Sequence, residues 1–232
     1  MSSRTQAGSS EIGSINEIRG KSLVISVFLE MPFGEIVVGS PGSGKSTYCY
    51  GKQQLLTALN RPISVVNLDP ANDNIPYTCA IDIASLITLK DVMDTYGLGP
   101  NGGMLYCMEY LEENFDWLDE KLKALGKDAY VVFDLPGQVE LSTNHESLKN
   151  IIKKLSKVGF RVWLTSITLF TAYAPPTQLA AVNFCDAHYV TDASKYIAVL
   201  MSSLRVMLHL ELPHINVLSK MDLITQYGDL GN

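Results

Sequence analysis

The stretch Gly39 to Thr47 reads GSPGSGKST, and the predicted fold is built around it. It follows a short apolar run at 36–38 and precedes a segment that favours a helix, which is the strand, glycine loop and helix order of a phosphate-binding loop. The glycines let backbone N–H groups converge on phosphate oxygens, Lys45 supplies a positive charge at the β- and γ-phosphates, and the Ser46 hydroxyl is a ligand for Mg²⁺. The predicted phosphate-binding residues are Gly39, Ser40, Pro41, Gly42, Ser43, Gly44, Lys45, Ser46 and Thr47.

Composition narrows the class of protein. The 232 residues are 47% hydrophobic and 18% charged, which is enough for one globular α/β domain with a sizeable core. The net charge of −6 argues against direct binding of nucleic acid, because phosphate backbones are bound by clustered Lys and Arg. The cysteines form no C-x-x-C pair and the histidines have no metal-ligand spacing, so neither a zinc site nor a disulfide framework is predicted.

Apolar runs alternate with helical patterns along the rest of the chain. Strands are predicted at 64–68, 130–133, 179–185 and 215–218, and helices at 46–59, 88–96, 104–112, 114–125, 146–158 and 193–210. This alternation predicts an α/β fold of the P-loop NTPase type, with a mainly parallel sheet and helices on both faces. Residues 1–30 are rich in Ser and Gly and are predicted to be a disordered extension, which leaves 31–232 as the domain.

Carboxylates follow two of the predicted strands. Asp69 comes at the end of the second strand, beside the nucleotide crevice, where it could meet Mg²⁺ or the attacking water. The alternative is that Asp69 merely forms a turn with Asn72 and Asp73.

Asp134 ends the strand at 130–133 and opens the sequence DLPGQ. At this position of a P-loop NTPase a carboxylate holds the Mg²⁺ shell, and the N–H of Gly137 can sense the γ-phosphate. Gln138 or Glu140 could orient the attacking water. The predicted metal ligands are therefore Ser46 and Asp134.

Residues 97–103 read GLGPNGG. Such glycine density around one proline predicts a tightly turned loop that presents Asn101 at its tip. A simple turn between two helices is the alternative.

The sequence SKMD at 219–222 follows the last predicted strand. An ionised carboxylate can accept both the N1–H and the exocyclic N2–H of guanine, whereas adenine presents neither pattern, and Asp222 is placed for this role. Lys220 can lay its aliphatic stem along the base. The bound nucleotide is therefore predicted to be GTP or GDP.

The motifs GSPGSGKST, NLDPAND, GLGPNGG, DLPGQVEL and SKMD together resemble the GPN-loop GTPases in order and approximate spacing. The resemblance covers about 31–161 and 179–230. It implies a homodimer, or a heterodimer with a GPN-loop paralogue, in which Asn101 reaches the partner's nucleotide. It also implies a role in the assembly and nuclear import of RNA polymerases II and III, through their subunits or assembly factors, and a cytoplasmic protein that can shuttle to the nucleus.

The sequence departs from the family pattern in three places: the extension before Met31, an apparent insertion at 162–178, and an end at Asn232 soon after the guanine motif. The insertion is too short to span a bilayer, so no membrane association is predicted. The fold is expected to be incomplete at its C-terminal side, without the family's last strand and helices.

The interpretation from sequence is a switch that binds GTP with Mg²⁺ and hydrolyses it by direct attack of water. Asp69 and Gln138 would position that water. Two alternatives remain. A P-loop kinase would need several arginines for a second phosphate substrate, and only Arg61, Arg161 and Arg205 follow Met31. A non-catalytic interaction module is the second alternative.

Overall fold

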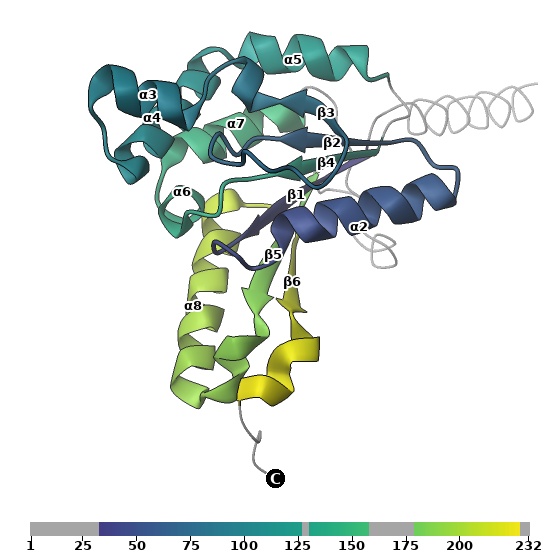
Figure 1. Ribbon diagram of the computed structural model, residues 1–232, viewed down its shortest axis with the longest axis vertical. Helices are drawn as coiled ribbons and strands as arrows, with labels where there is room; N and C mark the ends of the chain where they lie inside the picture. The colour runs from purple at the N-terminus through teal and green to yellow at the C-terminus, as the bar shows by residue number, and fades with distance from the viewer. Residues whose placement is uncertain (1–32, 127–129, 158–178, 228–232) are drawn as a thin grey trace, which may run out of the picture. The chain divides into compact units, whose positions relative to one another are not determined.

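The computed structural model describes residues 33–126, 130–157 and 179–227. Within these ranges the chain forms a six-stranded sheet in the order β3-β2-β4-β1-β5-β6 (Figure 1). All paired strands run parallel, which confirms the predicted parallel sheet. The strands are β1 Phe33–Gly39, β2 Ile63–Asn67, β3 Cys79–Asp82, β4 Tyr130–Asp134, β5 Leu179–Asp186 and β6 His214–Ser219.

The helices connect these strands and agree with most of the predicted boundaries. The α-helices are α2 Lys45–Ala58, α3 Leu89–Tyr96, α4 Pro100–Glu113, α5 Phe115–Ala124, α6 Val139–Thr143, α7 Glu146–Lys157 and α8 Ala193–Leu210. Short 3₁₀ helices cover Ile83–Ser85, Ala187–Thr191 and Met221–Tyr227. The predicted extension at 1–30 and insertion at 162–178 lie outside the described residues.

Helices cover both faces of the sheet, as predicted. Successive side chains of a strand point to opposite faces. Ile36 and Val38 of β1 belong to the larger core cluster, which includes buried residues of α4, α5, α7 and α8. Val37 points the other way and packs in a second cluster with Cys49 of α2. In Figure 1, α2 accordingly lies in front of the sheet and α7 behind it.

The structure adds a strand that the sequence analysis did not assign. β3 is four residues long and pairs with β2 alone among the described strands, with a register shift between Val65 and Val66. Its sequence, CAID, contains one β-branched residue, so its strand conformation follows from pairing with β2 rather than from local preference.

The expected loop at 97–103 is also shorter than predicted. Gly97 ends α3 in the left-handed conformation, and helix α4 begins at Pro100, so residues 100–103 are its first turn. Pro suits the first position of a helix because its fixed φ is helical and its missing N–H needs no partner there. Asn101 therefore lies on a helix end and not at the tip of an extended loop.

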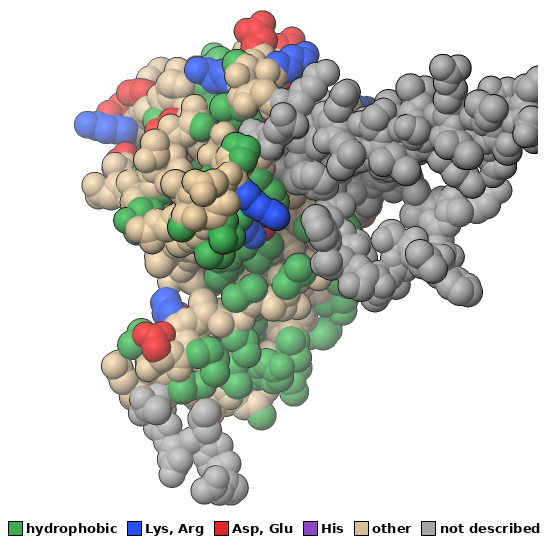
Figure 2. Space-filling model, turned by 90° about the vertical axis from the view of Figure 1, so that its right-hand side faces the viewer, with side chains coloured by type: hydrophobic (Ala, Val, Ile, Leu, Met, Phe, Trp, Pro, Cys, Tyr) green, Lys and Arg blue, Asp and Glu red, His purple; other side chains and the backbone are tan. Residues whose placement is uncertain are grey.

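Helix α8 leaves much apolar surface exposed. It buries Ser203, Val206 and Leu210, while Ile197, Met201 and Leu208 are 60%, 63% and 66% exposed. Hydrophobic side chains also gather over the lower part of the face in Figure 2, at the height of β6 in Figure 1. No helix in the described ranges combines the length and the apolar character needed to cross a bilayer.

Candidate nucleotide-binding site

The loop between β1 and α2 has the backbone of a phosphate cradle. Gly42 and Gly44 have φ angles of 70° and 94°, in the left-handed region that favours glycine. Gly44 is the N-cap of α2 and carries no side-chain cap, and no acidic residue lies in the first turn of this helix. The first N–H groups of α2 are therefore left for an external anion, with the positive end of the helix dipole behind them.

Lys45, in the first turn of α2, is buried against this loop with 7% of its surface exposed. Its ammonium group donates to the carbonyl of Ser40 at 3.3 Å. Burial lowers the pKa of Lys45, and the nearby charges of Asp134 and Asp69 oppose this effect. A phosphate would supply a strong anionic acceptor for this ammonium group.

The end of β4 brings a buried carboxylate to the same edge of the sheet. Asp134 is 1% exposed, and its Oδ2 accepts a hydrogen bond from the hydroxyl of Tyr77 at 2.9 Å. Its Oδ1 has no hydrogen-bond partner among the described residues. The Ser46 hydroxyl accepts a hydrogen bond from the side-chain amide of Asn72 at 3.4 Å. Its interaction with Asp134 lowers the pKa of that carboxyl, against the effect of burial.

These groups fit a Mg²⁺ ion. A buried carboxylate oxygen without a partner, beside a serine hydroxyl, matches the preference of this ion for oxygen ligands. The described residues contain no group of three or more His, Cys, Asp or Glu that could hold a metal.

Asp134→Asn is expected to stabilise the nucleotide-free protein while weakening its Mg²⁺-dependent nucleotide binding. Burial raises the pKa of Asp134, and Ser46, Tyr77 and Lys45 counter this only in part. A carboxylate whose pKa is higher in the folded than in the unfolded chain costs stability once it is ionised. We expect the free energy of unfolding to rise at pH 7, where the wild-type carboxyl is ionised.

Urea unfolding at several pH values checks this expectation. The gain should shrink as the pH falls through the raised pKa, because the wild-type carboxyl then also becomes neutral. Asp94→Asn, at an exposed position of α3, is the matched control and should change little. A variant less stable than the wild type at pH 7 would show that the ionised carboxylate supports the fold.

Asp69 lies just beyond β2 and is half-buried. Its carboxylate accepts the backbone N–H of Ala71 at 3.0 Å, and its own N–H donates to the side chain of Asn67 at 3.1 Å. Burial raises the pKa of Asp69, and Lys45 acts against this. The residue thus makes the turn contacts of the alternative interpretation and also stands near the phosphate lysine.

The loop after β4 contacts the phosphate loop directly. A Cβ atom added to Gly137 would lie 2.8 Å from Nζ of Lys45 and 2.9 Å from Cα of Pro41, so only glycine fits there. The side-chain amide of Gln138 donates to Oδ1 of Asn101 at 3.2 Å within the same chain. The structure therefore joins two of the predicted catalytic residues, Asn101 and Gln138, beside the loop.

The predicted guanine motif lies on the other side of the phosphate loop. A Cβ atom added to Gly44 would lie 4.0 Å from Cβ of Ser219. Lys220 has a φ angle of 58°, and its ammonium group pairs with Asp186 at 2.6 Å. Asp222 lies in the first turn of the 3₁₀ helix Met221–Tyr227 and is exposed.

The carboxyl ends of the strands thus hold all the predicted site residues near one edge of the sheet, apart from Asn101, which α4 brings there through Gln138. The sequence analysis missed three neighbours: Tyr77, Asn67 and Asp186. Only Asn67 had a signal, since it opens the motif NLDPAND. The partner of Tyr77 lies 57 residues away, so no local pattern indicates it.

A glycine loop and helix N-terminus at the end of a central parallel strand define the P-loop nucleotide-binding proteins, and this chain is one of them. The sequence profile of a family described as "Conserved hypothetical ATP binding protein" matches residues 37–177 and 160–230. Curated relatives carry the name GPN-loop GTPase 2, and the chain belongs to the GPN-loop GTPase family.

Two of these relatives give the extent of the similarity. GPN-loop GTPase 2 of Danio rerio is 57% identical over 198 residues, which are 85% of this chain and 58% of that protein. GPN-loop GTPase 2 of Saccharomyces cerevisiae is 46% identical over 202 residues, which are 86% of this chain and 54% of that protein. The chain therefore spans somewhat over half the length of these relatives.

A solved structure supports the fold independently. The apo form of a GTPase from Pyrococcus abyssi superposes with a TM-score of 0.65 and 27% sequence identity, covering 84% of this chain and 69% of that chain. The family description mentions ATP, whereas the relatives are named GTPases. Asp222, three residues after Ser219, stays a predicted guanine-binding residue.

Proposed function

We propose that this chain binds GTP and GDP with Mg²⁺ and hydrolyses GTP as a conformational switch. The observation that carries the proposal is the pairing of an uncapped helix N-terminus and buried Lys45 with the partly unsatisfied carboxylate of Asp134. Together they offer positive charge to phosphates and one anionic ligand to a metal. The names of the relatives support GTP as the nucleotide.

In this mechanism Mg²⁺ would be held by Ser46 and Asp134 and would offset charge on the phosphates. Lys45 and the first N–H groups of α2 would bind the β- and γ-phosphates and hold them in line for attack. Gln138 would orient the attacking water, and Asp69 would support it. Asn101 already contacts Gln138, so it would position the amide that orients the water.

The test of base selectivity is a titration with fluorescent GDP and a GTP analogue in the presence of Mg²⁺, with ATP as competitor. Saturable binding that ATP does not displace is expected. Asp222→Ala should weaken guanine nucleotides about 100-fold, because it removes two charge-assisted hydrogen bonds to the base. Asp94→Ala, at an exposed position of α3, is the control and should bind like the wild type.

If ATP displaces the guanine nucleotides as well as GTP does, the assignment of the base is wrong. If the folded wild-type protein binds no nucleotide at all, the proposal fails as a whole.

A non-catalytic interaction module is a second candidate. The observation that favours it is the exposed apolar side of α8, with Ile197, Met201 and Leu208 more than half exposed. Single-turnover measurement of phosphate release with excess protein separates the two candidates. Release of the γ-phosphate that Gln138→Ala abolishes supports the switch, whereas nucleotide binding without release supports the module.

The resemblance to the family supports a wider proposal. We infer that the chain pairs with a second copy or a GPN-loop paralogue and assists the assembly and nuclear import of RNA polymerases II and III, from a cytoplasmic location with nuclear shuttling. Molar mass in solution, with and without a GTP analogue, tests pairing. Co-purification with polymerase subunits, compared between wild type and Asp222→Ala, tests the nucleotide-dependent role.

A further inference from the structure

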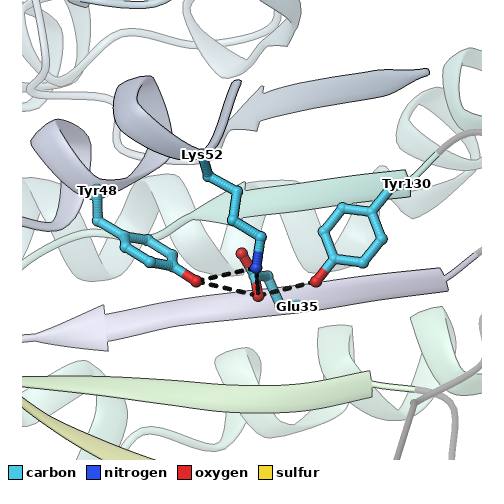
Figure 3. Close-up of polar contacts among 4 residues, drawn as sticks. All are labelled: Glu35, Tyr48, Lys52 and Tyr130. Carbon is cyan, nitrogen blue, oxygen red and sulfur yellow. Dashed lines mark hydrogen bonds and ion pairs between the residues drawn. The ribbon is translucent and has the colours of Figure 1, made fainter. Parts of the chain in front are cut away.

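A buried polar cluster ties the phosphate-binding helix to the sheet (Figure 3). Its centre is Glu35 on β1, which is 5% exposed. One carboxylate oxygen, Oε2, accepts hydrogen bonds from the hydroxyl of Tyr48 at 3.3 Å and from the ammonium group of Lys52 at 3.0 Å, both on α2. It also accepts from the hydroxyl of Tyr130, at the start of β4, at 2.9 Å.

Strand alternation explains why this carboxylate meets α2. Glu35 and Val37 are two residues apart on β1, so both side chains point to the face of the sheet that α2 covers. Along α2, residues Lys45, Tyr48 and Lys52 are spaced by three and four, which places them on one side of the helix. Lys45 therefore lies on the same side of the helix as Tyr48 and Lys52, the two hydrogen-bond donors to Glu35.

Helix α2 has few buried apolar contacts that could fix its orientation on the sheet. Of its residues only Lys45 and Cys49 are buried. By contrast, α7 buries Leu148, Ile151, Ile152 and Leu155 on the opposite face of the sheet. Hydrophobic burial thus packs α7 against the sheet. For α2, the polar cluster supplies directional contacts that hold the helix on the sheet.

The contacts within the cluster are tight and charged. Burial alone would lower the pKa of Lys52, but the Glu35 carboxylate and the neighbouring tyrosines raise it overall, so the lysine stays charged. Its ammonium group also lies 5.1 Å from the ring centroid of Tyr130 and 5.5 Å from that of Tyr48. Lys52 is thereby fixed between the helix, β1 and β4.

The cluster connects to the phosphate loop through Tyr48. The backbone N–H of Tyr48 donates to the carbonyl of Gly44, the N-cap of α2, at 2.9 Å. Its ring packs on Phe184 at a centroid distance of 4.9 Å, and Phe184 is the β5 residue paired with Gly39. A shift of α2 about its axis would therefore move the loop and Lys45 together.

We propose that Glu35 and Lys52 are positioning residues for the nucleotide site: their ion pair fixes the rotation of α2 and thereby the placement of Lys45 and Ser46. This inference rests on the proposed nucleotide binding, and it assigns an effect on affinity to residues that do not line the phosphate loop. Since both GTP and GDP use this loop, both affinities depend on the cluster.

The test compares variants of the full chain that remove different contacts to the Glu35 carboxylate, from α2 or from β4. Lys52→Met removes the tether from α2, and it should weaken binding of GDP and of a GTP analogue about tenfold. Tyr130→Phe is the matched control, because it removes a donor to the same oxygen from β4 and leaves both α2 contacts in place. Its affinities for both nucleotides should stay within about twofold of the wild type, because the hydrogen bond that it loses does not involve α2.

A double variant separates positioning from stability. Lys52→Met leaves the buried Glu35 charge unpaired, which destabilises the fold, whereas Glu35→Gln with Lys52→Met removes that charge as well. Urea unfolding should show that the double variant recovers stability, while its nucleotide affinity remains low. An affinity that recovers with stability, or an equal loss in Tyr130→Phe, would overturn the proposal.

Hydrogen exchange of the α2 amides, measured without nucleotide, gives a readout that does not depend on binding. Exchange should quicken in Lys52→Met and in the double variant but not in Tyr130→Phe. If the wild type binds no nucleotide, the proposed function fails while this measurement still decides whether the cluster anchors α2. Unchanged exchange in Lys52→Met would overturn the anchoring itself.

Discussion

Lys45→Ala is expected to abolish detectable binding of both GTP and GDP, with a loss of affinity of about 100-fold or more, since two or more charge-assisted hydrogen bonds to phosphate disappear. The side chain lies in the first turn of α2 and reaches back to the Ser40 carbonyl at 3.3 Å. It is 7% exposed, so its ammonium group is held against the loop.

The fold should survive this substitution. Burial lowers the pKa of Lys45, so the charged ammonium group gains little from its present surroundings in the nucleotide-free protein. Lys45→Met, which keeps the aliphatic stem and removes the charge, should lose the same affinity with less disturbance of packing. Agreement between the two variants would assign the loss to the charge and not to a cavity.

Equilibrium titration with fluorescent nucleotides measures the effect, and circular dichroism with urea unfolding shows that each variant is folded. Lys90→Ala, at an exposed position of α3, is the control and should bind like the wild type. A folded Lys45→Ala protein whose affinities stay within about threefold of the wild type would remove the basis of the phosphate site, since even a single lost charged hydrogen bond costs more.

The sheet and its central loop were predictable because their signals are local. Apolar runs of four to eight residues indicate buried strands, and GSPGSGKST places its glycines where the backbone must turn. The helix predicted at 88–96 was equally readable, and the structure begins α3 at Leu89, with Thr88 as its N-cap accepting the N–H of Asp91 at 3.1 Å. Each of these features depends on residues within one turn or one strand.

The features that escaped prediction depend on tertiary contacts. β3 has weak strand preference and exists because β2 offers an unpaired edge. Glu35 stands as one charge within the strand sequence FGEIVVG, and nothing near it indicates that Lys52 and Tyr130 complete its environment. The first turn of α4 was not predicted because its glycines favour loops. In the structure, Pro100 is the first residue of this helix.

Gly39→Ala is expected to cause the largest loss of stability of any single methyl addition in the loop. The φ angle of Gly39 is 146°, a conformation that residues with a Cβ atom rarely adopt. An added Cβ would lie 2.6 Å from the carbonyl oxygen of Phe184, a backbone atom of the neighbouring strand. Gly39 and Phe184 are register partners, so relief would require separating β1 from β5 at the centre of the sheet.

The expected cost combines backbone strain with overpacking, each of about 1–3 kcal/mol, for a total of about 4 kcal/mol in the free energy of unfolding. Urea unfolding of the nucleotide-free protein measures it. Two glycine variants separate the causes: Gly42→Ala, with a φ angle of 70° and nothing within 4 Å of the added atom, should show strain alone. Gly51→Ala, in the interior of α2 and equally open, should stabilise the protein by about 0.5–1 kcal/mol.

The order of these three variants tests the geometry of the loop without any ligand. If Gly39→Ala cost no more than Gly42→Ala, the close approach of β5 to the loop would be absent, and the phosphate cradle would not be held by the sheet. If the predicted order holds, the β1–β5 pairing fixes where the loop begins, just as the turn at Gly44 fixes where α2 starts. The phosphate position is then set by the central strands before any nucleotide arrives.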